Sequence, residues 1–312
     1  MKFAFVILHY NERTLEDTQE CVDSIRSVSV NQNYHITIVE NGSKDRSLSV
    51  LKTLYDESSD ISLVHSKENL GFANGNNLGC RQAIEEINPD FLIVINNDTV
   101  ITQEDFVTKI QEIYNTYHFH ILGPNIRDRN NHPQNPILEF PISIEQLDKG
   151  IRDLTLKLEV LNKSCFLYWL KYKRKKAMKR LVKNILLASP LNHLIGHASL
   201  RDKMSRDIQE GIGLHGAALI FSKEYYEMYK DVFYSGTFMY KEEDILYYRV
   251  KKHGLRSIYH PGIVIYHKED RSTDSRFKIG CSKERFIIKN QLASFKVYRD
   301  YIRKDLLQKG FS

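Results

Sequence analysis

The sequence "FLIVINNDTV", residues Phe91–Val100, indicates the fold most directly. Residues 92–95 are all apolar, which is typical of a strand buried on both faces in a parallel sheet covered by helices. Two asparagines, an aspartate and a threonine follow directly, at residues 96–99. A turn needs one or two such side chains, whereas a site that binds a cation, a sugar or a phosphate needs several. The rest of the chain has to decide between these two interpretations.

Apolar strands and helical segments alternate through the first half of the chain. We expect strands at residues 2–10, 35–43, 61–66 and 91–95. We expect helices at about 15–28 and at 44–57, and we expect residues 69–87 to be a loop that opens into a third helix. This alternation indicates an α/β fold with a Rossmann-like, mostly parallel central sheet flanked by helices. Ligands of such sheets bind beyond the carboxyl ends of the strands. Because all four ends are polar (9–12, 40–43, 65–71 and 96–99), a nucleotide-binding cleft is favoured over turns alone.

The glycine pattern argues against two other nucleotide-binding folds. A dinucleotide-binding dehydrogenase needs a glycine-rich turn after its first strand, and "VILHYNERTLED" contains no glycine. The phosphate-loop motif G-x-x-x-x-G-K-[ST] is also missing from the sequence. Gly71, Gly75 and Gly79 are spaced by four residues, so we interpret them as one closely packed helix face.

Composition describes an ordinary globular protein of one large or two small domains, with 312 residues, 42% hydrophobic and 27% charged. Residues 151–200 hold eleven Lys or Arg and two acids, a balance of +9, so the remainder carries −3 of the total +6. The charge of that remainder therefore gives no reason to expect nucleic-acid binding.

The start, "MKFAFVILHYNE", lacks a small-residue cleavage site and is expected to be a first strand rather than a signal peptide. We interpret Cys21, Cys80, Cys165 and Cys281 as reduced thiols of a cytoplasmic protein, because no C-x-x-C spacing is present.

At this point the motifs resemble a known family. "ILHYNE", "IVENGS", "ENLGFANGNNLG" and "FLIVINNDT" are similar, in that order, to the nucleotide-binding half of family 2 glycosyltransferases of GT-A fold. "GLHGAALIFSKEYYE", "FMYKEEDILYYRVKKHG" and "IVIYHKEDRST" continue the resemblance, which is strongest to the rhamnosyltransferase-like branch that builds bacterial surface polysaccharides. This resemblance covers most of the chain except for about residues 140–205. The implied segments are a nucleotide-sugar-binding half (1–140), a basic helical insert (141–205), an acceptor and catalytic half (206–275) and a C-terminal helical segment (276–312).

The resemblance implies a donor that is a nucleotide-diphospho-sugar, dTDP- or UDP-linked, and a divalent cation, Mn²⁺ or Mg²⁺. Asp98 of "NND" stands in for the D-x-D motif as a metal ligand, and His267 of "IYHKED" would be the second ligand. A hydrogen-bonded histidine at a strand end is the other interpretation of His267. Glu40 stands where the family usually has Asp, which accepts hydrogen bonds from the base. The expected donor contacts are Tyr10, Asn11, Glu12, Glu40, Asn41, Asn69, Gly71, Asn74, Asn96, Asn97 and Arg271.

Transfer with inversion needs a general base that takes the proton of the acceptor hydroxyl. "KEEDILYYRVKKHG" places Glu242, Glu243 and Asp244 at the start of a helix, where one or two acids are explained by the helix dipole alone. The family's E-D pair aligns with Glu243 and Asp244, which implies Asp244 as the base and Glu243 as the alternative.

Residues 267–276 are interpreted as a lid or as a solvated loop. Basic residues that could hold the leaving diphosphate are Arg249, Lys268, Arg271 and Arg276.

The expected function is that of an inverting, metal-dependent hexosyltransferase. It would move rhamnose or another hexose to a lipid-linked or polysaccharide acceptor, in synthesis of capsule, O-antigen or cell-wall glycan. A sugar-phosphate nucleotidyltransferase would need a glycine- and arginine-rich loop after the first strand, which is missing. A non-enzymatic nucleic-acid- or glycan-binding protein is supported only by the lysine-rich insert.

Segment 166–187 is expected to be an amphipathic helix. It combines the aromatic patch "FLYWL" with lysines beside an apolar stripe of Met178, Leu181, Val182 and Ile185. Such a helix suits an anionic membrane surface, so the protein would be peripheral at the inner face of the cell membrane. The alternative is a helix packed on the catalytic domain or in a homodimer.

Overall fold

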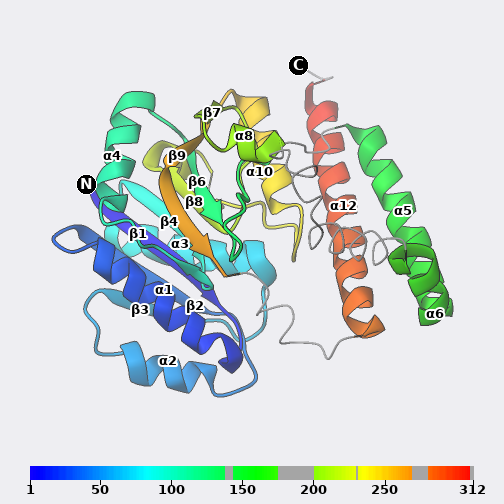
Figure 1. Ribbon diagram of the computed structural model, residues 1–312, viewed down its shortest axis with the longest axis horizontal. Coiled ribbons are helices and arrows are strands. Elements are labelled where there is room, and N and C mark those ends of the chain that lie inside the picture. Colours follow the sequence, from blue (N-terminus) through cyan, green and yellow to red (C-terminus); the bar gives the residue numbers. More distant parts are fainter. Residues whose placement is uncertain (138–142, 175–199, 230, 269–279, 310–312) are drawn as a thin grey trace, which may run out of the picture.

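The computed structural model describes residues 1–137, 143–174, 200–229, 231–268 and 280–309. Nine strands of this part form one sheet, in the order β3-β2-β1-β4-β8-β6-β9-β5, with β7 paired to β9 (Figure 1). The pairings β1–β2, β1–β4, β2–β3 and β6–β9 are parallel, and β8 is antiparallel to β4 and β6. The expected mostly parallel α/β sheet is therefore confirmed. The strands are β1 (Lys2–His9), β2 (Asn33–Glu40), β3 (Ile61–His65), β4 (Phe91–Asn96), β5 (Thr99–Val100), β6 (Ile121–Arg127), β7 (Gln209–Glu210), β8 (Ala218–Ser222) and β9 (Ser257–His267).

Helices cover both faces of this sheet. Successive side chains of a strand point to opposite faces. Phe3, Phe5 and Ile7 of β1 accordingly join one buried core, and Ala4 and Val6 join another. Helices α1 and α4 contribute to the first core, and α3, α9 and α10 to the second. The helices and short helical turns of the sheet-bearing part are η1 (Glu12–Thr14), α1 (Leu15–Val28), α2 (Ser47–Tyr55), α3 (Gly71–Ile87), α4 (Phe106–Tyr117), α8 (Leu200–Met204), α9 (Lys223–Met228) and α10 (Glu242–His253).

Two long helices, α5 (Ile144–Lys163) and α12 (Cys281–Lys309), lie side by side at one end of the molecule (Figure 1). Helix α5 begins with a capping box formed by Ser143 and Gln146. Leu147 of α5 packs with Ile245 of α10 and Tyr298 of α12 in a small buried cluster. This cluster attaches the helix pair to the sheet-bearing part. After α5 come the single turn α6 (Cys165–Tyr168) and the π-helical turn η2 (Trp169–Lys173).

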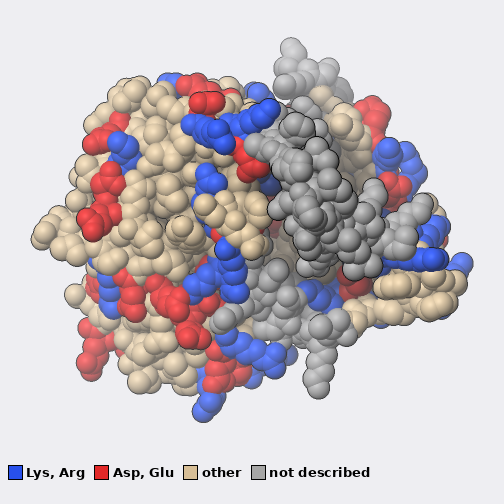
Figure 2. Space-filling model, in the orientation of Figure 1, with Lys and Arg blue, Asp and Glu red and all other residues tan. Residues whose placement is uncertain are grey.

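The surface of the sheet-bearing part is mixed in charge. On the face seen in Figure 2, basic and acidic side chains of the described residues are interspersed over this part. Large exposed apolar side chains gather instead on α6 and η2, where Phe166, Leu167 and Trp169 are 67%, 53% and 47% exposed. No helix in the described part of the chain is both long enough and apolar enough to cross a membrane.

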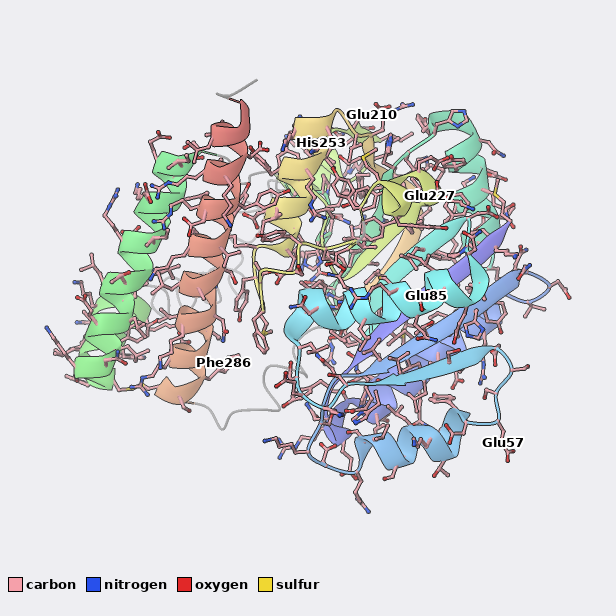
Figure 3. The ribbon with its side chains drawn as sticks, turned by 180° about the vertical axis from the view of Figure 1, so that it is seen from behind. Glu57, Glu85, Glu210, Glu227, His253 and Phe286 are labelled. Carbon is pink, nitrogen blue, oxygen red and sulfur yellow. A yellow bond between two sulfur atoms is a disulfide. The ribbon has the colours of Figure 1, made fainter. Side chains whose placement is uncertain are left out.

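The glycine spacing on α3 serves close packing, as expected. A Cβ at Gly75 would lie 2.6 Å from Leu8 Cδ1, and a Cβ at Gly79 would lie 2.6 Å from side chains of Val6 and Val39. Both distances are too short for real contacts. Helix α3, seen across the sheet in Figure 3, can therefore lie directly on β1 and β2.

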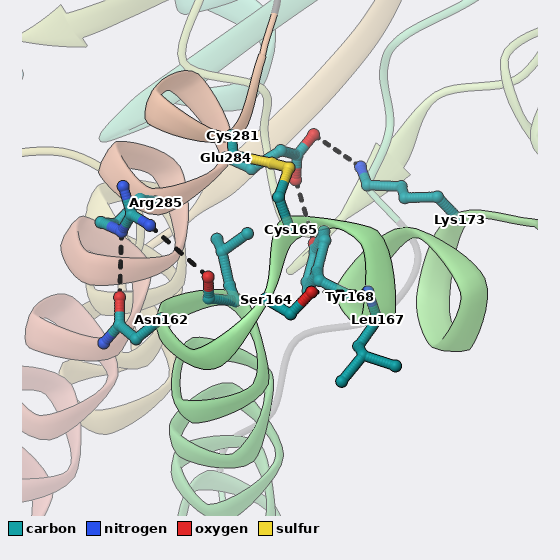
Figure 4. The surroundings of a disulfide bond; sticks show 10 residues. Asn162, Ser164, Cys165, Leu167, Tyr168, Lys173, Cys281, Glu284 and Arg285 are labelled. Carbon is teal, nitrogen blue, oxygen red and sulfur yellow. Dashed lines mark hydrogen bonds and ion pairs between the residues drawn. A yellow bond between two sulfur atoms is a disulfide. The ribbon is translucent and has the colours of Figure 1, made fainter.

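The expectation of four reduced cysteines is wrong for two of them. Cys165 and Cys281 form a disulfide across a sequence separation of 116 residues, with Cα atoms 6.1 Å apart (Figure 4). The pairing of α5 with α12 brings the two residues together, and nothing in the spacing of the cysteines indicates it. Glu284, one turn into α12, adds contacts to Tyr168 Oη at 3.0 Å and Lys173 Nζ at 2.7 Å. Cys21 and Cys80 are free and buried, and burial raises the pKa of the Cys21 thiol to about 12.

Candidate active site

The four polar strand ends meet at one edge of the sheet. In the strand register His9 of β1 is paired with Glu40 of β2, Glu40 with His65 of β3, and Leu8 with Asn96 of β4. Because these strands are parallel and end together, the loops that follow them adjoin one another. The four polar strand ends are therefore neighbours, as the prediction of one site requires.

A cavity of 240 Å³, which we name the strand-end cavity, opens at this edge. Phe238 and Met239, in the loop before α10, form one wall, and Phe286 of α12 reaches it from the helix pair (Figure 3). Gly71 begins α3 here with φ +77°, and a Cβ on it would lie 2.1 Å from Phe238 O. The expected donor-site residues that line the cavity are Tyr10, Asn41, Asn69, Gly71, Asn96, Asn97 and Asp98.

Asp98 and His267, 169 positions apart, face each other at this edge. A two-residue turn of Asn97 and Asp98 joins β4 to β5. Strand β5 then pairs with β9, with Thr99 opposite His267. As a result Asp98 Oδ1 lies 3.2 Å from His267 Nε2. The side chain of Asp98 is 13% exposed and that of His267 is 10% exposed. The two predicted metal ligands are thus neighbours.

The hydrogen bonding of His267 leaves Nε2 available for a cation. Its Nδ1 lies 2.8 Å from Gln134 Oε1, and an amide oxygen can only accept, so Nδ1 carries the proton. With the proton on Nδ1, Nε2 faces the Asp98 carboxylate, where it either carries a second proton and donates to Asp98 or presents its lone pair to a cation that the two side chains share. Ligand atoms about 2.1 Å from one octahedral cation, at right angles, lie about 3 Å apart. The pair fits Mn²⁺ or Mg²⁺, with Gln134 fixing the orientation of the ring.

His215 also lies near this pair, 5.9 Å from His267 between ring centroids. Burial lowers its pKa to about 4, so it is neutral near pH 7. Within the described ranges no group of three or more His, Cys, Asp or Glu side chains is arranged to hold a metal ion. Two protein ligands hold a cation weakly, which suits a cation that arrives with a diphosphate.

Four expected donor contacts lie away from the strand-end cavity. Glu40 is fully buried, and its carboxylate accepts from Ser43 N at 2.9 Å and contacts His65 Nδ1 at 3.0 Å. It therefore orders the loop after β2. The others also have protein partners: Asn11 caps η1, Glu12 pairs with Arg46, and Asn74 donates to Ser235 O. Arg271 and Arg276 lie outside the described residues.

A comparison with protein families identifies the chain. The sequence model described as "Glycosyl transferase family 2" matches residues 4–200, which is more than half of the chain. The chain belongs to glycosyl transferase family 2. A 76-residue region is also 33% identical to the low-salt glycan biosynthesis hexosyltransferase Agl10 of Haloferax volcanii. That region covers 24% of this chain and 24% of Agl10, so the chain matches only about a quarter of its curated relative.

Solved structures show the same fold at low sequence identity. TarS 1-349 of S. aureus in complex with UDP-GlcNAc has a TM-score of 0.51 and 10% identity, and the match covers 95% of this chain and 66% of that one. GalNAc-T7 with UDP, GalNAc and Mn²⁺ has a TM-score of 0.52 and 10% identity, over 87% of this chain and 44% of that one. These likenesses confirm the GT-A fold expected for this family 2 member.

The acids at the start of α10 have separate surroundings. Asp244 Oδ1 accepts a 2.6 Å hydrogen bond from Lys241 Nζ, and burial raises the pKa of this carboxyl despite the neighbouring ammonium. Glu243 Oε1 accepts from Gly216 N at 3.2 Å, at the start of the segment that leads into β8. Burial, with Glu243 nearby, raises the pKa of Glu242 to about 8.

Two of the basic residues expected near the diphosphate have structural partners. The Arg249 guanidinium is buried, lies 4.7 Å from the Tyr229 ring centroid and donates to Val232 O at 3.1 Å. Arg249 is therefore a core residue of this family 2 member, and its expected place at the cleft is wrong. Lys268 pairs with Asp17 and Glu20 of α1.

The residues missed in the sequence are Gln134, Phe238, Met239 and Phe286. Gln134 stands in an irregular segment after β6, and its role depends on a contact with a residue 133 positions away. Phe286 belongs to a helix far from the nucleotide-binding half. Of these four residues, only Phe238 and Met239 could have been found in the sequence, because in "FMYKEED" they directly precede the acidic start of a helix.

Proposed function

We propose that this chain is a metal-dependent hexosyltransferase that uses a nucleotide-diphospho-sugar, with UDP- and dTDP-linked sugars, including rhamnose, as the first donors to test. The observation that carries the proposal is the Asp98–His267 pair at the strand-end cavity of a family 2 chain. The name of Agl10 and the ligands in the structures of TarS and GalNAc-T7 support a hexose and a UDP-linked donor.

The chain's own residues would position the donor and move one proton. Tyr10, Asn41 and Asn69 would surround the nucleoside, and Asp98 and His267 would hold the cation. A bound Mn²⁺ or Mg²⁺ neutralises charge that develops on the departing diphosphate. Asp244 is the proposed base, and Glu243 the alternative. The acceptor oxygen forms a bond to the anomeric carbon, the bond to the diphosphate oxygen breaks with its electron pair, and the carboxylate takes the hydroxyl proton.

We further propose that α6 and η2 contact an anionic membrane surface, where a lipid-linked acceptor of a surface glycan would lie. Phe166, Leu167 and Trp169 are exposed side by side in sequence, and Lys171 and Arg174 follow them. Aromatic side chains next to basic ones suit the headgroup region, where each Lys or Arg contributes about 1 kcal/mol. The apolar stripe at 178–185 lies outside the described residues.

The test follows release of nucleoside diphosphate from a panel of UDP- and dTDP-sugars, with and without Mn²⁺. At least one donor should be consumed in a metal-dependent way. Asp98→Ala should abolish both this turnover and the metal dependence of UDP binding. An Asp98→Ala variant whose UDP binding responds to Mn²⁺ as in the parent contradicts the assignment.

A further inference from the structure

Helix α12 contributes the ring of Phe286 to the lining of the strand-end cavity (Figure 3). Among the described residues the other lining side chains come from the strand ends, from the start of α3 and from the loop before α10. A nucleotide in this cavity would therefore meet an aromatic ring that belongs to a helix outside the sheet-bearing part.

Another face of the same helix segment is fastened to α5, α6 and η2 (Figure 4). Residues 281, 284, 285 and 288 recur at spacings of three and four, so they share this face. Their links are the Cys281–Cys165 disulfide, the contacts of Glu284 to Tyr168 and Lys173, the 2.9 Å hydrogen bond from Arg285 Nε to Asn162 Oδ1, and a buried cluster of Ile288 with Leu154, Leu161 and Tyr168. Each residue turns an α-helix by about 100°, so Phe286 lies about 140° around the helix from Cys281, away from the fastened face.

The cavity side of α12 has a second contact with the wall at Phe238 and Met239. Ser294 is 2% exposed, and its Oγ donates to Met239 O at 2.6 Å. From the side of α3, Phe72 N donates to Phe238 O at 2.7 Å. The backbone of this wall is therefore held between α3 and α12, and the same α12 carries Phe286.

The position of Phe286 depends on how firmly the start of α12 is held. The first four N–H groups of a helix have no partner within the helix, and helix ends fray. Phe286 is the sixth residue of α12, so its ring moves if this end frays. The disulfide joins the first residue of α12 covalently to α6, and the contacts of Glu284 and Arg285 follow within one turn.

We propose that α12 completes the donor site: Phe286 packs against the bound nucleotide, and the Cys165–Cys281 disulfide with its neighbouring contacts holds Phe286 in place. This inference rests on the proposed function, because its ligand is the nucleotide of that donor. The strand ends supply polar groups, whereas a nucleobase also has an apolar π-face that an aromatic ring can cover. Phe286 is thus a contact residue, and the two cysteines are positioning residues that act through it.

Calorimetry of the whole chain with Mn²⁺ and either UDP or dTDP tests the contact. Phe286→Ala should raise the Kd about tenfold, as expected for the loss of an aromatic contact to a nucleobase. Phe286→Leu keeps an apolar side chain, so it is the variant to use if the alanine variant does not fold, and it should raise the Kd about threefold. Leu307→Ala is the control and should bind as the parent does, because Leu307 is an apolar residue of α12 that is 65% exposed.

Reduction tests the positioning role separately. Dithiothreitol breaks the Cys165–Cys281 bond: each sulfur takes one electron and one proton, and the dithiol is oxidised to its cyclic disulfide. The other two of the four cysteines, Cys21 and Cys80, are free, so this is the bond that responds. The Kd of the reduced parent should rise about threefold, and reduction should not weaken Phe286→Ala further, because the contact that the disulfide holds is already missing.

The double variant Cys165→Ser, Cys281→Ser should bind like the reduced parent with or without dithiothreitol, which controls for any effect of the reductant on Mn²⁺. An unchanged Kd in the Phe286 variants overturns the contact. An unchanged Kd in the reduced parent, or an equal rise on reduction in the parent and in Phe286→Ala, overturns the positioning role. A parent protein that binds neither UDP nor dTDP contradicts the proposed function and this inference with it, whereas the other results contradict the inference alone.

Discussion

Replacing Gln134 with leucine tests the proposed metal site without touching either ligand. Gln134 is 9% exposed, and its Oε1 accepts from His267 Nδ1–H at 2.8 Å. Leucine is similar in size but has no acceptor, so the tautomer that presents Nε2 to a cation is no longer fixed. Losing such a partner of a metal-bound histidine typically weakens metal affinity about 10–100-fold, which corresponds to about 1.4–2.7 kcal/mol.

The same substitution should also lower the stability of the fold. His267 is 9% exposed, so its Nδ1–H would be left buried without this acceptor, at a cost of about 1–3 kcal/mol. Gln134→Glu places a carboxylate oxygen at the same reach, where it still accepts from His267 Nδ1–H. It should therefore recover most of the metal affinity that Gln134→Leu loses.

The assay is UDP binding by calorimetry over a series of Mn²⁺ concentrations, with the half-saturating Mn²⁺ concentration as the readout. Gln103→Leu is the control, because the Gln103 side chain also bonds β9, at Gly262 O and Val264 N, without contacting His267. A Gln134→Leu protein that is folded and has the Mn²⁺ dependence of the parent refutes the reasoning. An equal shift in Gln103→Leu refutes it as well, because the effect would then come from a general disturbance of β9.

The remaining predictions concern the base and the membrane surface. Asp244→Asn cannot accept a proton, so the chemical step in single-turnover assays should slow by about 10²–10⁴-fold while UDP affinity is kept. Full activity in that variant, with the loss found in Glu243→Gln, moves the role to Glu243. In liposome flotation the parent should bind vesicles that contain anionic lipid and dissociate with rising salt. The double variant Phe166→Ser, Trp169→Ser should lose this binding, whereas the control Leu156→Ser on α5 should keep it. Equal flotation of the two variants contradicts a membrane contact through α6 and η2.

The first four strands of the sheet, the helices between them and the edge where their polar ends gather can be predicted from the sequence alone. Alternating apolar strands and helices, the spacing of Gly75 and Gly79, and polar residues at every strand end are local patterns. Each depends on side-chain periodicity or on the backbone needs of one element, so each can be read without knowing which segments touch. For this reason residues as far apart as Tyr10, Asn69 and Asp98 were expected at one site and line one cavity.

Contacts between segments distant in the chain follow from the folded structure alone. The β5–β9 pairing places His267 beside Asp98, and the segment after β6 supplies Gln134 behind it. The packing of α5 on α12 brings Cys165 and Cys281 together and, with the start of α10, encloses a second cavity of 470 Å³. Helix α12 also brings Phe286 to the strand-end cavity. These features have no local sequence signal, because each arises from the distance between surfaces that meet only after the chain has folded.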